Sequence, residues 1–146
     1  RVRAERVLQA MTRVGLKAVA MHGNKDQKER NRALEQFRNN EVQILVATDV
    51  TARGIDIPSV PFVVNYDVPD VAENYVHRVG RTGRGMDKGY AITFYDESEK
   101  DFLEAVEDFI GTRIDRMVLD YEEREATIDF SADAKYDWRS LIDDEK

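Results

Sequence analysis

The sequence predicts an α/β domain with a mainly parallel sheet, and two observations lead to this prediction. Short apolar runs alternate with amphipathic helical stretches along most of the chain, as in strand–helix–strand units. In addition, the strongest strand pattern, residues 42–48, is rich in β-branched residues and apolar on both faces. Strands of that kind suit a parallel sheet that helices cover on both sides.

Two helices and two strands are expected in the first third of the chain. A first helix should end at Gly15, because apolar residues precede it at helical spacing: Val7, Leu8, Met11 and Val14. Residues 17–21 then indicate a short buried strand. A second helix is expected to begin at Asp26, which stands three residues before Glu29 as in a capping box. The strand at 42–48 follows it.

The middle of the chain repeats this order. Residues 61–66 are predicted to form a third strand, and 89–95 a fourth. Between them, Asp70 and Glu73 have capping-box spacing and are expected to cap a helix that runs to about Val79.

The last predicted helix ends at Gly111, and residues 113–119 are expected to add an edge strand. Three aromatic residues are assigned to the core: Phe94, Phe102 and Phe109. The helix–strand pattern weakens after about residue 120. We therefore expect a domain over 1–120 and an acidic carboxyl-terminal extension over 121–146.

Composition excludes several classes of protein. The chain has no cysteine and only two histidines, so disulfides, cysteine-held zinc and a histidine-rich metal site are not expected. No apolar run approaches the roughly 20 residues of a membrane span, and no secretory signal is recognised. A soluble cytoplasmic protein that does not act at a membrane is the expectation.

The net charge of −7 is unevenly distributed. Residues 121–146 hold 9 acidic and 4 basic residues, whereas residues 1–120 hold 20 and 18. This argues against a wide basic surface but leaves room for a narrow cationic cluster, because phosphate binding depends on local fields.

Three polar segments directly follow predicted strands: residues 21–24, 47–56 and 65–84. Ligands of parallel sheets bind beyond the carboxyl ends of the strands, so we expect all three segments at one edge. His22 precedes a glycine, and a turn-stabilising role is at least as well supported as ligand contact. Asp49 is expected to hold its own loop by hydrogen bonds.

Arginines recur at three-residue intervals at Arg78, Arg81 and Arg84, among glycines. Each presents a rigid fork of donors suited to phosphate oxygens. Several arginines directed at one point would repel each other unless an anion lay there, and a polyphosphate in transfer is such an anion. The alternative is a solvated basic helix end.

These residues carry a resemblance to the second RecA-like domain of DEAD-box RNA helicases. His77-Arg78-Val79-Gly80-Arg81-Thr82-Gly83-Arg84 resembles motif VI, and residues 47–56, Ala-Thr-Asp-Val-Thr-Ala-Arg-Gly-Ile-Asp, resemble motif V. Gln27-Lys28-Glu29-Arg30 resembles motif IVa, and Asn65-Tyr66-Asp67-Val68-Pro69 resembles motif Va. The resemblance implies a three-layer RecA-like fold, similar to P-loop NTPases.

The resemblance also implies roles for single residues. Arg81 and Arg84 would reach the γ-phosphate of ATP as arginine fingers, with Asp56 on the ribose. His77, supported by Arg78, would join the network that couples nucleotide to RNA. The expected contacts to the RNA sugar-phosphate backbone come from five residues: Gln27, Arg30, Thr48, Arg53 and Gly54.

Three features of the family do not occur in this sequence. It has neither a Walker A pattern nor an Asp-Glu-Ala-Asp block, which the resemblance assigns to the N-terminal RecA-like domain of the same protein. That domain would hold most of the Mg²⁺ that accompanies ATP. We therefore expect an ATP-hydrolysing helicase as the complete protein and an isolated domain without ATPase activity. The family's first strand, before the helix that ends near Val14, is also missing, so a slot in the sheet is expected to be empty.

Two alternatives remain at this point. One is a stand-alone RNA-binding or regulatory module that kept the fold, which Arg81 and Arg84 disfavour, since RNA binding does not need them. The other is a related motor that acts on DNA, which the spelling of motifs V and VI disfavours. A scaffold role for the acidic extension is compatible with either.

Overall fold

The computed structural model describes residues 2–52, 57, 59–83 and 88–118. By its contacts the chain divides into two compact units, Arg1–Thr112 and Arg113–Lys146. The described residues of the second unit, 113–118, form neither helix nor strand, so the edge strand expected there is wrong. Charged residues interrupt this short run, and a pattern of that kind does not specify a strand partner. The predicted boundary between 120 and 121 stays a prediction.

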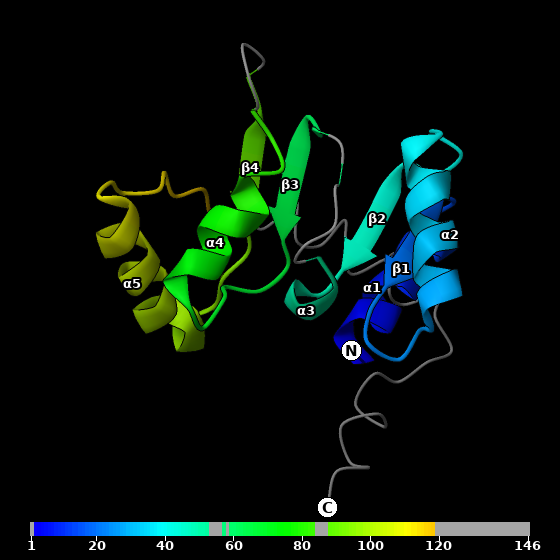
Figure 1. The fold of residues 1–146 in the computed structure, drawn as a ribbon. Helices are drawn as coiled ribbons and strands as arrows, with labels where there is room; N and C mark the ends of the chain where they lie inside the picture. The colour runs from blue at the N-terminus through cyan, green and yellow to red at the C-terminus, as the bar shows by residue number, and fades with distance from the viewer. Residues whose placement is uncertain (1, 53–56, 58, 84–87, 119–146) are drawn as a thin grey trace, which may run out of the picture. The chain divides into compact units, whose positions relative to one another are not determined.

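In the first unit, β1 (Ala18–Met21) and β2 (Ile44–Ala47) form a parallel pair, as expected. α2 (Gln27–Arg38) connects the two strands, and both α1 (Val2–Arg13) and α2 pack against them (Figure 1). The register pairs Ala18 with Ile44, Val19 with Leu45, Ala20 with Val46 and Met21 with Ala47.

The local signals that start α2 and end α1 are confirmed. Asp26 Oδ1 accepts from the Glu29 amide at 2.7 Å, and Glu29 Oε2 accepts from the Asp26 amide at 2.9 Å. These two bonds form the predicted capping box. Gly15 has φ +81°, a conformation that favours glycine and ends the first helix where expected.

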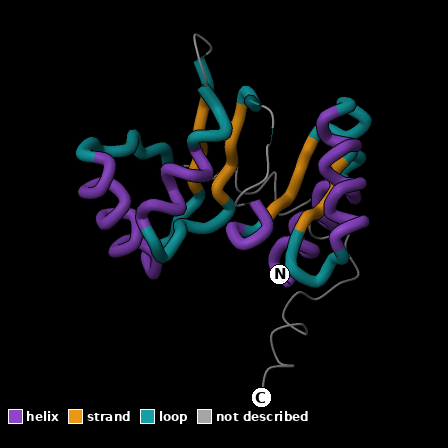
Figure 2. Tube along the Cα trace, viewed as in Figure 1, coloured by secondary structure: helices purple, strands orange, loops and turns teal. Residues whose placement is uncertain are grey.

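A second parallel pair consists of β3 (Phe62–Asn65) and β4 (Tyr90–Thr93). α4 (Ala72–Val79) packs on β3 and on α5 (Lys100–Ile110). Two short elements complete the unit: α3 (Asp49–Ala52) after β2, and the 3₁₀ helix η1 (Glu97–Glu99) before α5. Figure 2 shows each strand pair with its helices.

The predicted cap of α4 is wrong. Its N-cap is Val71, one residue later than expected, and no side chain caps it. The Asn74 amide instead donates to the Val71 carbonyl at 3.0 Å. This one-residue shift takes Asp70 and Glu73 out of capping-box register, and both side chains are exposed.

The two pairs are separate two-stranded sheets in the described part of the chain. β2 is bonded on one edge to β1, and β3 on one edge to β4, so each has a second edge without a strand partner among the described residues. Parallel strands normally lie inside larger sheets.

The core is formed mainly by small and aliphatic side chains, with Met21, Leu103 and Val106 fully buried. The assignment of three phenylalanines to the core is wrong: Phe94, Phe102 and Phe109 are 50%, 43% and 53% exposed. In α5 the buried stripe runs through Leu103 and Val106, and the two phenylalanines of that helix lie on a neighbouring stripe. One face of the β3–β4 pair is also exposed, with Phe62 stacked on Tyr90 at a centroid distance of 5.5 Å.

Candidate functional site

The carboxyl ends of β1 and β2 are joined through one carbonyl group. The Met21 carbonyl accepts hydrogen bonds from Thr51 Oγ1 at 2.8 Å and from the Thr48 amide at 3.3 Å. The two threonine hydroxyls lie 3.1 Å apart, and Thr51 is buried. Thr48, an expected RNA contact, is therefore held directly beside the end of β1.

The loop after β1 turns at His22, as the sequence indicated. The His22 carbonyl accepts from the Lys25 amide at 3.0 Å, and His22 Nδ1 accepts from the Asn24 amide at 3.3 Å. The side chain of Arg30, in the first turns of α2, reaches back to this loop and donates through Nε to the Lys25 carbonyl at 2.9 Å. Arg30 and Thr48 thus lie at neighbouring strand ends.

Gln27, the other expected RNA contact in this helix, is exposed. Its side-chain nitrogen donates to Asn31 Oδ1 at 2.9 Å, one helical turn further on. This bond orients the amide along the surface of α2. The remaining predicted RNA contacts, Arg53 and Gly54, lie outside the described residues, as does Asp56.

Arg78 of α4 is tied to two carboxylates. Its Nε and Nη2 donate to the two oxygens of Asp49 at 2.7 Å each, and its Nη1 donates to the Asp67 carbonyl at 2.8 Å and to Asp67 Oδ1 at 3.3 Å. Burial acts to lower the pKa of Arg78, but the hydrogen bonds and charges of Asp49 and Asp67 outweigh it and raise the pKa above its ordinary value. The guanidinium is therefore a permanent cation between β2 and β3.

This network was only partly predicted. The sequence indicated that Arg78 supports the coupling network of His77; its bonds to Asp49 and Asp67 are new, and the support of His77 stays a prediction. The partner of Asp49 was not predicted, since Arg78 lies 29 residues away in the sequence. Asp67 was predicted only as part of motif Va, without a partner. Arg3 of α1, whose Nη1 lies 3.5 Å from Asp67 Oδ2, was not predicted to take part.

The segment after α4 lies at the opposite end of β3. Thr82 Oγ1 donates to the Val60 carbonyl at 2.5 Å, and the Val60 amide donates to the Arg81 carbonyl at 2.9 Å. Val60 precedes β3, whereas Asn65 ends it. The expectation that residues 65–84 share one edge with the other two segments is therefore wrong for Arg81 and Thr82, because α4 carries the chain back along β3.

Gly89 makes this arrangement possible. A Cβ atom there would lie 2.5 Å from the Gly83 amide nitrogen and would overlap the Thr82 hydroxyl. Gly83 itself has φ +64°. Two glycines thus permit close approach of the chain to itself at the end of motif VI.

Of the remaining residues predicted for nucleotide chemistry, His77 is exposed on the last turn of α4, and Arg81 is partly buried. Arg81 lies two residues beyond the end of α4, in a turn where its amide donates to the Arg78 carbonyl at 3.2 Å. Arg84 lies outside the described residues.

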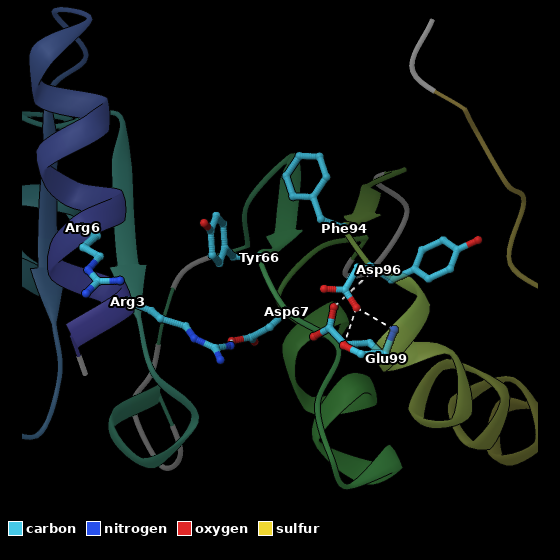
Figure 3. Close-up of a pocket in the computed structure, with 9 residues that line it drawn as sticks. Arg3, Arg6, Tyr66, Asp67, Phe94, Asp96 and Glu99 are labelled. Atoms are coloured by element: carbon cyan, nitrogen blue, oxygen red, sulfur yellow. Dashed lines mark hydrogen bonds and ion pairs between the residues drawn. The ribbon is translucent and has the colours of Figure 1, made fainter. Parts of the chain in front are cut away.

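An open pocket of about 520 Å³ lies at the carboxyl ends of β3 and β4 (Figure 3). Arg3 and Arg6 of α1 line one side, with Tyr66 and Asp67 between them and the acidic side chains around η1. Asp96 accepts from the amide and hydroxyl of Ser98, which are the main reasons that its pKa lies below the ordinary value. Charges of both signs therefore line this pocket.

No group of His, Asp or Glu side chains suited to a metal ion occurs among the described residues. No helix in that part of the chain is long and apolar enough to span a membrane.

Comparison with known proteins agrees with this geometry. A family model described as the helicase conserved C-terminal domain matches residues 1–86. The chain belongs to the helicase C-terminal domain family, as found in DEAD-box proteins. The predicted resemblance is confirmed.

Among relatives of this DEAD-box domain, the ATP-dependent RNA helicase abstrakt of Drosophila melanogaster is 54% identical over 84 residues, which cover 58% of the chain. The chain spans 14% of the length of that protein over the same match.

Solved structures confirm the RecA-like α/β fold class. The E. coli DEAD-box protein SrmB, solved with regulator of ribonuclease activity A, matches with a TM-score of 0.77 and 36% identity, over 82% of this chain and 70% of that one. S. cerevisiae Dbp5 bound to RNA and ADP BeF3 matches with a TM-score of 0.72 and 32% identity, over 90% and 36%.

Proposed function

We propose that this domain is the second RecA-like half of an ATP-dependent RNA helicase and works with an N-terminal RecA-like domain of the same protein. It would supply arginine fingers to ATP and half of the RNA-binding surface. The observation that carries this proposal is that two arginines of motif VI, Arg78 and Arg81, lie in different surroundings. Arg78 is occupied by Asp49 and Asp67, while Arg81 lies at the far end of α4 beside Val60.

This arrangement fits two separate binding sites, one for RNA and one for the nucleotide. Arg30 and Thr48 lie at the carboxyl ends of β1 and β2, where Gln27, Arg53 and Gly54 would complete a surface for the RNA sugar-phosphate backbone. Such contacts position a strand without reading its bases, so sequence preference should be weak. Arg81 lies at the other end of β3, where Arg84 and Asp56 would join it at the nucleotide.

ATP with Mg²⁺ is the proposed cofactor. As the family resemblance implies, the N-terminal RecA-like domain would hold most of the metal. Mg²⁺ there would neutralise charge on the phosphates. Arg81 and Arg84 would stabilise the charge that develops on the transferred phosphoryl group, and Asp56 would hold the ribose by its hydroxyls.

Arg78 would then couple the RNA-binding segment to the nucleotide site. It joins the segment after β2, which holds the expected RNA contacts, to α4, which carries His77 and leads into the turn with Arg81. A rigid link between these elements would transmit RNA binding to the arginine fingers, with His77 in the same coupling network. Closure of the two domains would bring the fingers to ATP only when RNA is bound.

The test is ATP hydrolysis by this chain alone, and by the complete protein with and without RNA. We expect no turnover from the chain alone and RNA-stimulated turnover from the complete protein. A complete protein that binds RNA but shows no turnover would overturn the helicase proposal and leave an RNA-binding module. A preference for DNA over matched RNA in a competition assay would replace it with a DNA motor.

A further inference from the structure

His22 is a buried polar residue whose side chain links a distant helix to the loop before α2. It is 3% exposed, and its Nε2 lies 2.5 Å from Glu5 Oε1 on α1. The pair joins residues 17 positions apart. Lys25 adds to the cluster, with its Nζ 3.6 Å from the same Glu5 oxygen.

The contacts of His22 fix both its tautomer and its ring orientation. Nδ1 accepts a hydrogen bond from the Asn24 amide, so the ring proton belongs on Nε2, which donates it to Glu5. Glu5 is suited to accept it, because the His22 hydrogen bond is the largest of the effects that lower the pKa of Glu5. The carboxylate therefore holds the ring, and the ring holds the Asn24 amide.

This chain of contacts continues to Arg30. The His22 carbonyl accepts from the Lys25 amide at 3.0 Å, and the Lys25 carbonyl accepts from Arg30 Nε at 2.9 Å. In the described part of the chain Nε is the only nitrogen of the Arg30 side chain with a recorded partner. Its two terminal nitrogens remain available for a two-point contact with a phosphate.

We infer that Glu5 and His22 are positioning residues, which hold the loop of residues 22–25 so that Arg30 presents its terminal nitrogens to RNA. The inference rests on the proposed RNA contact of Arg30. Stability alone does not call for this cluster, since replacing both partners of a hydrogen bond by apolar groups of the same shape can leave stability nearly unchanged. What the cluster does provide is a fixed carbonyl at Lys25 against which the guanidinium is oriented.

The test uses the complete protein, a fluorescent single-stranded RNA and dissociation constants measured over a range of salt concentrations. Arg30→Ala should weaken binding about tenfold and reduce the salt slope by about one, as for one lost phosphate contact. His22→Ala and Glu5→Ala should each weaken RNA binding and reduce the salt slope in the same direction, but by less than Arg30→Ala. The decisive variant combines His22→Ala with Arg30→Ala. It should bind within about twofold of Arg30→Ala alone, because both changes remove the same contact.

Two further variants separate positioning from loss of structure. Thr93→Val removes the 3.0 Å hydrogen bond to the buried Asn65 side chain, far from the loop in sequence, and should leave RNA affinity unchanged at a similar cost in stability. His22→Gln keeps a side-chain donor and acceptor and should restore part of the affinity. Glu5 lies on a partly exposed helix position, so Glu5→Ala provides the test if His22→Ala does not fold.

The outcomes distinguish this inference from the proposed function. If Arg30→Ala weakens binding but the His22 and Arg30 losses add, or if Glu5→Ala has no effect, the positioning role is wrong and the RNA site stands. If Arg30→Ala leaves affinity and salt slope unchanged, the proposed RNA contact is wrong, and the inference fails with it.

Discussion

Arg78 and Asp49 form a two-point ion pair in which both carboxylate oxygens accept from one guanidinium at 2.7 Å. Their side chains are only 20% and 32% exposed. If one partner is removed, water can therefore reach and solvate the remaining charge only in part. The pair joins the end of β2 to α4, and with Asp67 it also reaches the end of β3. Among the described residues, it is therefore the main polar connection between the β1–β2 pair and the β3–β4 pair.

Asp49→Asn should lower the free energy of unfolding by about 2–4 kcal/mol, because it leaves a buried guanidinium without its full counter-charge. Arg78→Lys should also destabilise, since an ammonium keeps the charge but cannot make the two-point contact. Urea unfolding measures both. The control is Glu97→Gln, which removes an exposed pair with Lys100 and should change stability by less than about 0.5 kcal/mol. A loss for Asp49→Asn no larger than that of the control would contradict the structural role.

Gly89→Ala tests the close approach at the end of motif VI. The added methyl group would overlap Thr82 and meet the Gly83 amide, so the segment that begins at Arg81 must move. We expect a loss of stability of about 2–3 kcal/mol, as for overpacking, together with slower ATP hydrolysis by the complete protein. Gly111→Ala is the matched control. It meets no atom, and should cost only about 1 kcal/mol of backbone strain at φ +72° without changing turnover.

Much of the fold followed from sequence because its signals are local. Alternating apolar runs predicted the strands and their parallel pairing, and the Asp26–Glu29 box marked the start of α2. The signal failed where a shift of one residue matters, as at Val71, and where a helix has more apolar residues than its buried stripe, as at Phe102.

The site was harder to predict, because its geometry depends on how α4 returns along β3. The sequence identified Thr48 and Arg81 but placed both at one edge, whereas the pairing of Val60 with Thr82 puts Arg81 at the other end of β3. Glu5 was missed altogether. Its only sequence signal is an acidic residue in the first turn of a helix, which ordinarily serves the helix dipole.

Hydrogen exchange tests whether a further strand belongs between β2 and β3. Both strands have one edge without a partner among the described residues, and unpaired amides exchange with solvent. If a parallel strand occupies that place in the complete protein, the outward amides of Ile44–Ala47 and Phe62–Asn65 should exchange at least about tenfold more slowly there than in this chain alone. Equal exchange in both proteins would argue against such a strand, and α5 amides serve as the reference.

The ionisation of Glu5 should make the free energy of unfolding depend on pH in the acidic range. Its pKa lies below the ordinary 4.5, chiefly because of the His22 hydrogen bond and against a smaller effect of burial. A carboxyl group whose pKa is lower in the folded state contributes stability above its unfolded pKa, and this contribution is lost as pH falls through the folded value. The difference in unfolding free energy between wild type and Glu5→Gln should therefore shrink between about pH 5 and pH 3. Glu104→Gln, an exposed change on α5, is the control, and a difference that stays constant over this range would contradict the assignment.

Arg81→Ala tests the proposed arginine finger, and ATP hydrolysis is the measurement. Arginines that reach a transferred phosphoryl group contribute about 10³–10⁵ to turnover, so the complete protein should lose at least about 10³ in kcat. The affinity of the variant for RNA should change by less than about twofold, because Arg81 lies at the amino-terminal end of β3, whereas Arg30 and Thr48 lie at the carboxyl ends of β1 and β2. Arg81→Lys should be nearly as slow, since lysine lacks the planar fork. Lys17→Ala removes an equal charge from an exposed position and should leave turnover unchanged. If Arg81→Ala hydrolyses ATP within about tenfold of wild type, the charge on the phosphoryl group is stabilised elsewhere, and Arg81 is a structural residue like Arg78.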